Sequence, residues 1–226
     1  MIIAPILCVI AFGAAIGLAP PRARAAVTAA GESAALRDLL ARLQRHYQAT
    51  ASFIARFDET ILRPGAPPLI RTGTLAWRRP GLIRFDYGAP QPETIVSDGR
   101  TLYDYDPGLN QVMETPLKSA IKAQAAAALL LGVGNLERDF AASSLSEPTS
   151  DGLSHALLTP RAGGPRIEIG VDPATMNIVT LTITDALGNR TEFRFSAIRL
   201  NAAIAAERFA FKTPDGADVV TPETGP

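Results

Sequence analysis

The sequence predicts a mainly β protein of the α+β class, with about eleven antiparallel strands in a barrel or half-barrel and two helices across one face. Three observations predict this fold. Apolar and polar residues alternate through most segments of the chain, which is typical of strands buried on one side. Short turns rich in glycine, proline and aspartate separate these segments. Only two segments have helical periodicity, so helices are the minor component.

The first helix is predicted from Ser33 to Gln48, with Ser33 as its N-cap. Its apolar residues form one stripe, and its charged residues lie on the other side. The apolar stripe consists of Leu36, Leu39, Leu40, Leu43 and Tyr47. The second helix is predicted between Pro116 and Gly132, a segment rich in alanine and leucine.

The strands are predicted from alternation and from the turns between them. The clearest turn is Asp98-Gly99, which predicts a tight hairpin between two alternating runs. A second hairpin turn is predicted around Gly188. The strands are expected at 51–62, 69–78, 82–87, on both sides of Asp98-Gly99, and at 111–114, 136–143, 152–160, 165–172, 177–186 and 190–200.

An arginine ends one of the apolar rows. Alternation puts Leu75, Trp77 and Arg79 on one face, directly before the strand-ending Pro80. A guanidinium has five donors, which need partners if the group is not in water. From these residues alone, the simplest interpretation is a solvated arginine at a strand end.

The first 25 residues are interpreted as a cleaved secretory signal peptide. Residues 2–18 are almost entirely apolar, and Ala23 and Ala25 are small residues flanking a cleavage site. The mature protein would then begin near Ala26 as a single domain, 26–226. Two alternatives are an uncleaved membrane anchor and a lipoprotein modified at Cys8. Cys8 is the sole cysteine, so a mature chain would have neither a disulfide nor thiol chemistry.

Composition limits the classes of partner. Without Arg22 and Arg24, the charge balance changes from 22 basic and 22 acidic residues to 20 and 22. The mature domain is therefore nearly neutral, and it has no basic tract with interleaved aromatic residues. We expect no nucleic-acid partner.

Catalytic motifs are missing from the sequence. His46 and His155 have no metal-ligand spacing around them, and no nucleophile, phosphate or dinucleotide motif occurs. Asp104 and Asp106 could form a carboxylate pair, but turn-capping aspartates are commoner. We therefore expect neither an enzyme nor a cofactor or metal. A curved sheet with an apolar face could instead surround an apolar ligand.

Three stretches of the chain carry a pattern that a known protein family shares. The longest is "GTLAWRRPGLIRFDYGAPQPETIVSDGRTLYDYDPGLNQV", and the others are "LLARLQRHYQATASFIARF" and "AERFAFKTPDGADVV". These stretches resemble the LolA family of periplasmic lipoprotein carrier proteins. Together they extend from about residue 36 to residue 220. The residues that carry the pattern of the longest stretch are Gly73, Leu75, Arg79, Pro80, Arg84, Phe85, Tyr87, Pro90, Ser97, Asp98, Gly99 and Tyr105. The family usually has its tryptophan at the position of Ala76, whereas it stands here at Trp77.

The resemblance implies an incomplete antiparallel β-barrel whose helices form a lid over an apolar concave face. It also implies a periplasmic monomer that takes acylated lipoproteins from an inner-membrane lipoprotein-releasing transporter to an outer-membrane acceptor lipoprotein. In the family, the arginine at the position of Arg79 holds the lid closed, so Arg79 is the expected latch. The residues expected to line the lipid-binding cavity are Phe53, Phe57, Leu75, Trp77, Ile83, Phe85, Leu36, Leu39, Leu43 and Leu129.

Two other functions fit the same half-barrel. One is a carrier of another envelope lipid or a glycolipid. The other is a sensor that binds a lipid or a peptide to regulate an envelope pathway. For the cavity residues, the alternative is an ordinary dry core.

Overall fold

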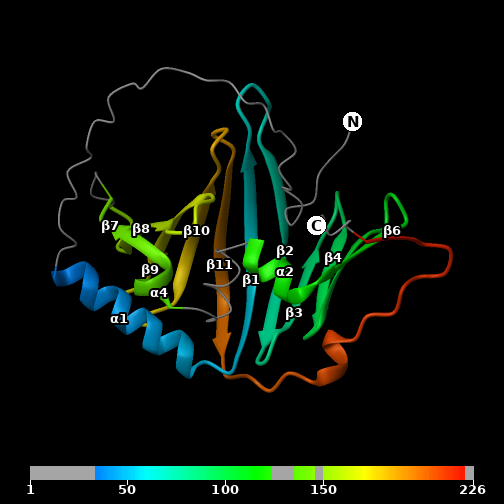
Figure 1. Cartoon of the computed structure of the whole chain (residues 1–226), viewed down its shortest axis with the longest axis horizontal. Coiled ribbons are helices and arrows are strands. Elements are labelled where there is room, and N and C mark those ends of the chain that lie inside the picture. Colours follow the sequence, from blue (N-terminus) through cyan, green and yellow to red (C-terminus); the bar gives the residue numbers. More distant parts are fainter. Residues whose placement is uncertain (1–33, 124–134, 146–149, 222–226) are drawn as a thin grey trace. The chain divides into compact units, whose positions relative to one another are not determined.

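A single sheet of twelve strands is the main feature of the computed structural model, which describes residues 34–123, 135–145 and 150–221 (Figure 1). In chain order the strands are β1 (Ser52–Leu62), β2 (Leu69–Arg78), β3 (Leu82–Tyr87), β4 (Glu93–Asp98), β5 (Thr101–Asp106), β6 (Gln111–Pro116), β7 (Phe140–Ser143), β8 (Ser154–Pro160), β9 (Arg166–Val171), β10 (Ile178–Thr184), β11 (Arg190–Leu200) and β12 (Asp218–Val220).

The sheet is open. Its strand order is β12-β6-β5-β4-β3-β2-β1-β11-β10-β9-β8-β7, so β12 and β7 are the two edges, and no pairing joins them among the described residues. Neighbouring strands are antiparallel, except that β12 is parallel to β6. The prediction of a mainly β, incomplete barrel is therefore confirmed.

The predicted strands are all present, with two differences. The structure adds β12, which is too short to show alternation. The segment predicted as a strand at 136–143 begins instead as the short helix α4 (Leu136–Asp139), and only its second half is β7. Asn135 explains the difference, because its Oδ1 accepts a hydrogen bond from the backbone N–H of Arg138 at 2.8 Å. That contact caps a helical turn.

Aspartate side chains close the hairpins. At the turn between β4 and β5, Asp98 Oδ1 accepts hydrogen bonds from the backbone N–H groups of Arg100 at 2.8 Å and Thr101 at 2.9 Å. Gly99 has a φ of 93°, a conformation that glycine adopts without a steric penalty. Asp185 and Gly188 have the same roles between β10 and β11. Both predicted hairpin turns are confirmed.

Strand register defines two faces of the sheet. Phe53 on β1 lies opposite Trp77 on β2, and Trp77 lies opposite Ile83 on β3. Their side chains share one side of the sheet, called here the front face. The alternate residues, such as Ile54 and Ala76, belong to the back face. Each face is covered by a different segment of the chain.

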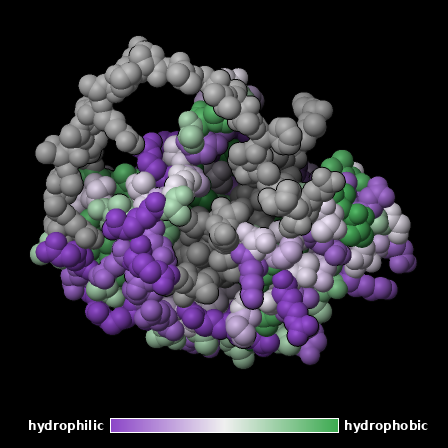
Figure 2. Space-filling model, in the orientation of Figure 1, coloured by the Kyte–Doolittle hydropathy of each residue, from purple (hydrophilic) through white to green (hydrophobic). Residues whose placement is uncertain are grey.

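The helix α1 (Ala34–Ala49) is fixed to the start of β10. The Tyr47 hydroxyl accepts a hydrogen bond from the N–H of Ile178 at 3.1 Å, and burial raises the pKa of Tyr47 to about 12. His46 Nε2 lies 3.1 Å from Asn177 Oδ1. The side of α1 opposite its buried residues is hydrophilic (Figure 2).

The second helix, α2, is described from Leu117 to Ala123. The rest of the predicted second helix and the predicted N-cap Ser33 lie outside the described residues.

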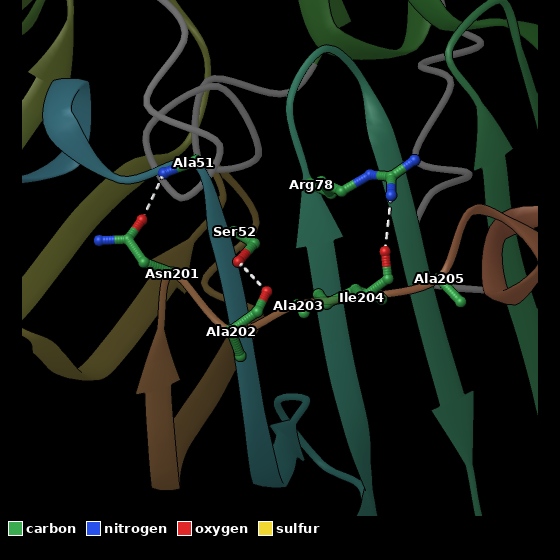
Figure 3. A pocket seen from close by; sticks show the side chains of 8 residues that line it. All are labelled: Ala51, Ser52, Arg78, Asn201, Ala202, Ala203, Ile204 and Ala205. Atoms are coloured by element: carbon green, nitrogen blue, oxygen red, sulfur yellow. Dashed lines mark hydrogen bonds between the residues drawn. The ribbon is translucent and has the colours of Figure 1, made fainter.

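Residues 201–211, called here the strap, follow β11 and run along the ends of the neighbouring strands (Figure 1), where they contact the back face. The strap contains the 3-10 helix η1 (Ala206–Phe209), and its Ile204 and Phe209 pack on Ala76 of β2. Arg78 Nη1 donates a hydrogen bond to the Ile204 carbonyl at 2.6 Å, beside a groove of about 600 Å³ (Figure 3). Beyond η1, the ring of Phe211 stacks on Tyr103 with a centroid distance of 5.0 Å.

None of the helices in the described ranges is long and apolar enough to cross a membrane. The predicted signal peptide and domain boundary lie outside these ranges and stay predictions.

The strap should contribute strongly to stability. Phe209 is 1% exposed, and the variant Phe209→Ala should lower the free energy of unfolding by about 3–5 kcal/mol, because it leaves a cavity on the back face. Leu187→Ala is the control, since Leu187 is 80% exposed at a hairpin tip and should change stability by less than about 0.5 kcal/mol. Urea unfolding of both variants measures the difference, and equal losses would contradict the packing described for the strap.

Candidate functional site

A row of aromatic rings crosses the middle of the front face. The rings of Phe53 and Trp77 are stacked, with a centroid distance of 5.9 Å and an interplanar angle of 1°. Phe57 lies at the centre of a second group, with centroid distances of 5.7 Å to Phe85 and 5.9 Å to Phe193. These contacts join β11, β1, β2 and β3 into one apolar surface.

The structure brings together most of the residues predicted to line the cavity. Phe53, Phe57, Leu75, Trp77 and Ile83 are buried on the front face, and Phe85 is half-buried there. On α1, Leu36 and Leu43 are buried and Leu39 is half-buried. Leu129 lies outside the described residues. Burial is common to a cavity lining and a dry core, so the assignment of these residues to a lipid-binding cavity stays a prediction.

Phe193 and Phe195 are part of the same surface and were missing from the prediction. Phe195 lies 6.3 Å from Phe53 between ring centroids, and Phe193 and Phe195 are stacked at 5.9 Å. Alternation in the segment 190–200 does place both rings on one face. The sequence did not show that β11 pairs with β1, so nothing assigned the two rings to the front face.

Arg79 connects the sheet to the end of α1. Its Nη2 donates a hydrogen bond to the carbonyl of Tyr47 at 2.8 Å, and its Nε donates to the carbonyl of Thr50 at 3.0 Å. Carbonyl groups at a helix C-terminus lack partners within the helix and carry partial negative charge. A planar, charged guanidinium fits two such acceptors at once. The function of this contact as a latch stays a prediction.

Beyond the aromatic rings, the front face contains a buried ionic cluster that the sequence analysis missed. It consists of Glu59 on β1, Arg71 on β2, Glu93 on β4 and Asp104 on β5, and none of the four is more than 8% exposed. Arg71 donates through Nη2 to Glu93 Oε2, and its Nε lies 3.8 Å from Glu59 Oε2. The guanidinium also lies over the ring of Tyr87, 3.6 Å from its centroid.

Asp104 corrects one interpretation of the sequence. Asp106 does cap the turn, because its Oδ1 accepts from the N–H groups of Gly108 at 2.7 Å and Leu109 at 3.2 Å. Asp104 lies two residues earlier, so its side chain points to the front face and belongs to the cluster. Alternation could have placed Asp104 beside the apolar residues, but its charged partners come from other strands.

Burial makes the carboxyl groups of the cluster weak acids. Desolvation raises the pKa of Glu59 to about 7, although the Arg71 guanidinium opposes the shift. Desolvation, together with the charge of Glu93, raises the pKa of Asp104 to about 8. Three carboxyl groups share one guanidinium, so protonation is the way in which the cluster reduces its excess negative charge.

Residues 48–212 match the family described as outer membrane lipoprotein carrier protein LolA. The outer-membrane lipoprotein carrier protein of Cupriavidus necator is 37% identical over 150 residues, which are 66% of this chain and 70% of the relative. The corresponding protein of Leptothrix cholodnii is 36% identical over 188 residues, which are 83% of this chain and 87% of the relative.

Among solved structures, an uncharacterized conserved protein from Thermus thermophilus is similar in fold. Its TM-score is 0.51 at 11% sequence identity, and the match covers 83% of this chain and 99% of that chain. The fold and the site thus place the chain among proteins that are built on an open β-sheet with an aromatic face. The chain belongs to the LolA family, and the resemblance found in the sequence is confirmed.

The ionic cluster should make stability depend on pH. The folded-state pKa of Glu59 is about 7, above the ordinary value of 4.5, so the folded protein holds this proton more tightly than the unfolded chain does. The stabilisation is complete below pH 4.5 and is lost as the pH rises to about 7. Asp104 extends the loss to about pH 8.

Glu59→Gln should remove the Glu59 part of this dependence. Between pH 4 and pH 8, the variant should lose less free energy of unfolding than the wild type, by about 3 kcal/mol. Urea unfolding at several pH values measures the difference. Asp58→Asn is the matched control, because Asp58 is the exposed neighbour on the back face and its removal should leave the profile unchanged. The same profile in Glu59→Gln as in the wild type would contradict the raised pKa.

Proposed function

We propose that this protein is a periplasmic carrier that shields the acyl chains of lipoproteins and moves them from the inner membrane to the outer membrane. Its cargo would come from an inner-membrane lipoprotein-releasing transporter and go to an outer-membrane acceptor lipoprotein. Membership of the LolA family supports this function. The carrier acts by binding and release and not as an enzyme.

The attachment of α1 by Arg79 is the observation that carries the proposal. A carrier must uncover an apolar surface for its cargo and cover it again when it is empty. The Arg79 side chain provides a contact that can open, because two hydrogen bonds, and no covalent bond, join this side chain to the backbone carbonyls of Tyr47 and Thr50 at the end of α1. Charge-assisted hydrogen bonds of this kind contribute about 1.5–3 kcal/mol each.

Cargo transfer also needs a moderate affinity. Moving an acyl chain from water to an apolar surface is favourable by about 0.8 kcal/mol per methylene group, so a permanently open apolar face would release its cargo slowly. Closing α1 against the sheet competes with the cargo for the same surface. The strength of the Arg79 contact then sets the balance between the open, loaded state and the closed, empty state.

Arg79→Leu should separate loading from release. Leucine keeps an aliphatic side chain but removes every donor, so the closed state loses its two hydrogen bonds. The variant should accept acylated lipoproteins normally and transfer them to the acceptor at least about tenfold more slowly. A transfer assay with purified donor membranes and acceptor measures both steps.

Arg78→Leu is the matched control for this experiment. Arg78 is the adjacent arginine, it is also half-buried, and it also donates to a backbone carbonyl, that of Ile204, but on the back face. This variant should transfer its cargo at the wild-type rate. Normal transfer by Arg79→Leu, or equal defects in both variants, would show that Arg79 is not a latch.

The front face should bind acyl chains directly. The protein has one tryptophan, Trp77, which stacks on Phe53. An environment-sensitive acyl probe added under native conditions should bind with a stoichiometry near one and should change the Trp77 emission. The aromatic contacts of Phe57 predict that Phe57→Ala weakens this binding by about tenfold or more. If no apolar probe binds, the front face is an ordinary core and the carrier function loses its physical basis.

A further inference from the structure

The buried ionic cluster is placed where the head of an amphiphilic ligand would lie. Phe57 and Glu59 are consecutive front-face residues of β1, and on β4 Ile95 and Glu93 are consecutive in the same way. Consecutive residues on one face are about 7 Å apart along a strand. The carboxyl groups therefore border the aromatic rings, and a ligand with its acyl chains against the rings would bring its head to them.

The acceptors of the cluster are only partly used. Within the described residues, both carboxyl oxygens of Glu59 have no hydrogen-bond partner, although the residue is 0% exposed. Glu93 Oε1 and Asp104 Oδ2 likewise have no hydrogen-bond partner there. Buried polar atoms without partners are rare, because each one costs the free energy of its lost hydration. Before a proton is placed on the cluster, four acceptor atoms therefore lack a donor among the described residues, and the Nε donor of Arg71 lacks an acceptor.

The charge balance indicates what that donor is. Three carboxylates and one guanidinium have a net charge of −2. Glu93 and Asp104 are close enough to share one proton by a hydrogen bond between their side chains, which reduces the net charge to −1. The remaining charge is that of Glu59, whose nearest cationic atom among the described residues is Arg71 Nε at 3.8 Å. One additional monovalent cation would therefore neutralise the cluster.

We infer that the ionic cluster binds the primary ammonium group of an acylated ligand, with Glu59 as its counter-ion. An ammonium group is compact and has three donors, enough for both oxygens of Glu59, which still lack a donor when Glu93 and Asp104 share a proton. The group could be the amino terminus of a lipid-modified polypeptide or the head of an aminolipid. This inference rests on the proposed function, since it assigns a place to the polar part of the same ligand.

The test compares ligands of equal chain length that differ in the head group. Dodecylammonium, dodecanol and dodecanoate are titrated at pH 7.5 against the bound environment-sensitive acyl probe. Wild-type protein should bind dodecylammonium at least tenfold more tightly than dodecanol, and dodecanoate most weakly. Equal affinity for dodecylammonium and dodecanol would overturn the inference and leave the carrier function intact. If dodecanol does not bind either, the proposed function itself fails.

Glu59→Gln tests the assignment of the counter-ion. The variant should bind dodecanol as the wild type does, which shows that it is folded, but should lose the preference for dodecylammonium. Asp58→Asn removes the adjacent carboxylate from the back face and should keep the preference. A preference that survives in Glu59→Gln would overturn the role of this residue, and its loss in Asp58→Asn would indicate an effect of net charge alone and would also overturn it.

Two further comparisons identify the source of the ammonium group. In the first, a synthetic S-diacylglyceryl-cysteine peptide is compared with the same peptide acetylated at its amino terminus. In the second, phosphatidylethanolamine is compared with phosphatidylglycerol of the same chains. A preference for the free amine in the first pair assigns the cluster to the polypeptide, and a preference in the second assigns it to a lipid head. No preference in either pair would overturn the inference.

Discussion

The pairing of β1 on both sides is the constraint on which the rest of the structure depends. β1 joins β2, its neighbour in the chain, to β11, which comes near the end of the chain. Phe57 has Phe195 opposite it on one side and Gly73 on the other. A Cβ atom at Gly73 would lie 2.6 Å from the Phe57 ring and still closer to the Asp86 carbonyl. Only glycine therefore allows the central ring to lie across β2.

This pairing makes one sheet from two runs of strands, and it decides what the front face can do. The rings of Phe193 and Phe195 come from the second run, whereas Phe53, Trp77 and Phe85 come from the first. Without the β1–β11 pairing, each run would have a small apolar patch at its edge. With it, the rings form one apolar surface across β11, β1, β2 and β3, and no pairing joins the two edges of the sheet among the described residues.

The two faces are covered in physically different ways. On the back face, the strap is continuous with β11, and it is held by the packing of Phe209 and by backbone contacts from Arg78 and Arg84. On the front face, α1 is held by its buried leucines and by the hydrogen bond between Tyr47 and Ile178, and at its end by two hydrogen bonds from Arg79, which follows β2. In the proposed function, the Arg79 contact is the one that opens, because hydrogen bonds from a partly exposed arginine can exchange with water.

The sequence by itself determined the fold class, the hairpin turns, the stripe of α1 and the eleven longer strands, except that the segment predicted as a strand at 136–143 begins as the helix α4. These features depend on residues that are near each other in the chain, because alternation and turn chemistry are local. The resemblance to the LolA family also singled out Arg79. The tertiary structure decided which rings meet across β1 and β11, and how the strap leads to β12. It alone showed that Glu59, Arg71, Glu93 and Asp104 form one buried cluster. Each of these residues looks like an ordinary surface charge in its own strand, and only the register between strands brings them together, because register is set by pairings between distant parts of the chain.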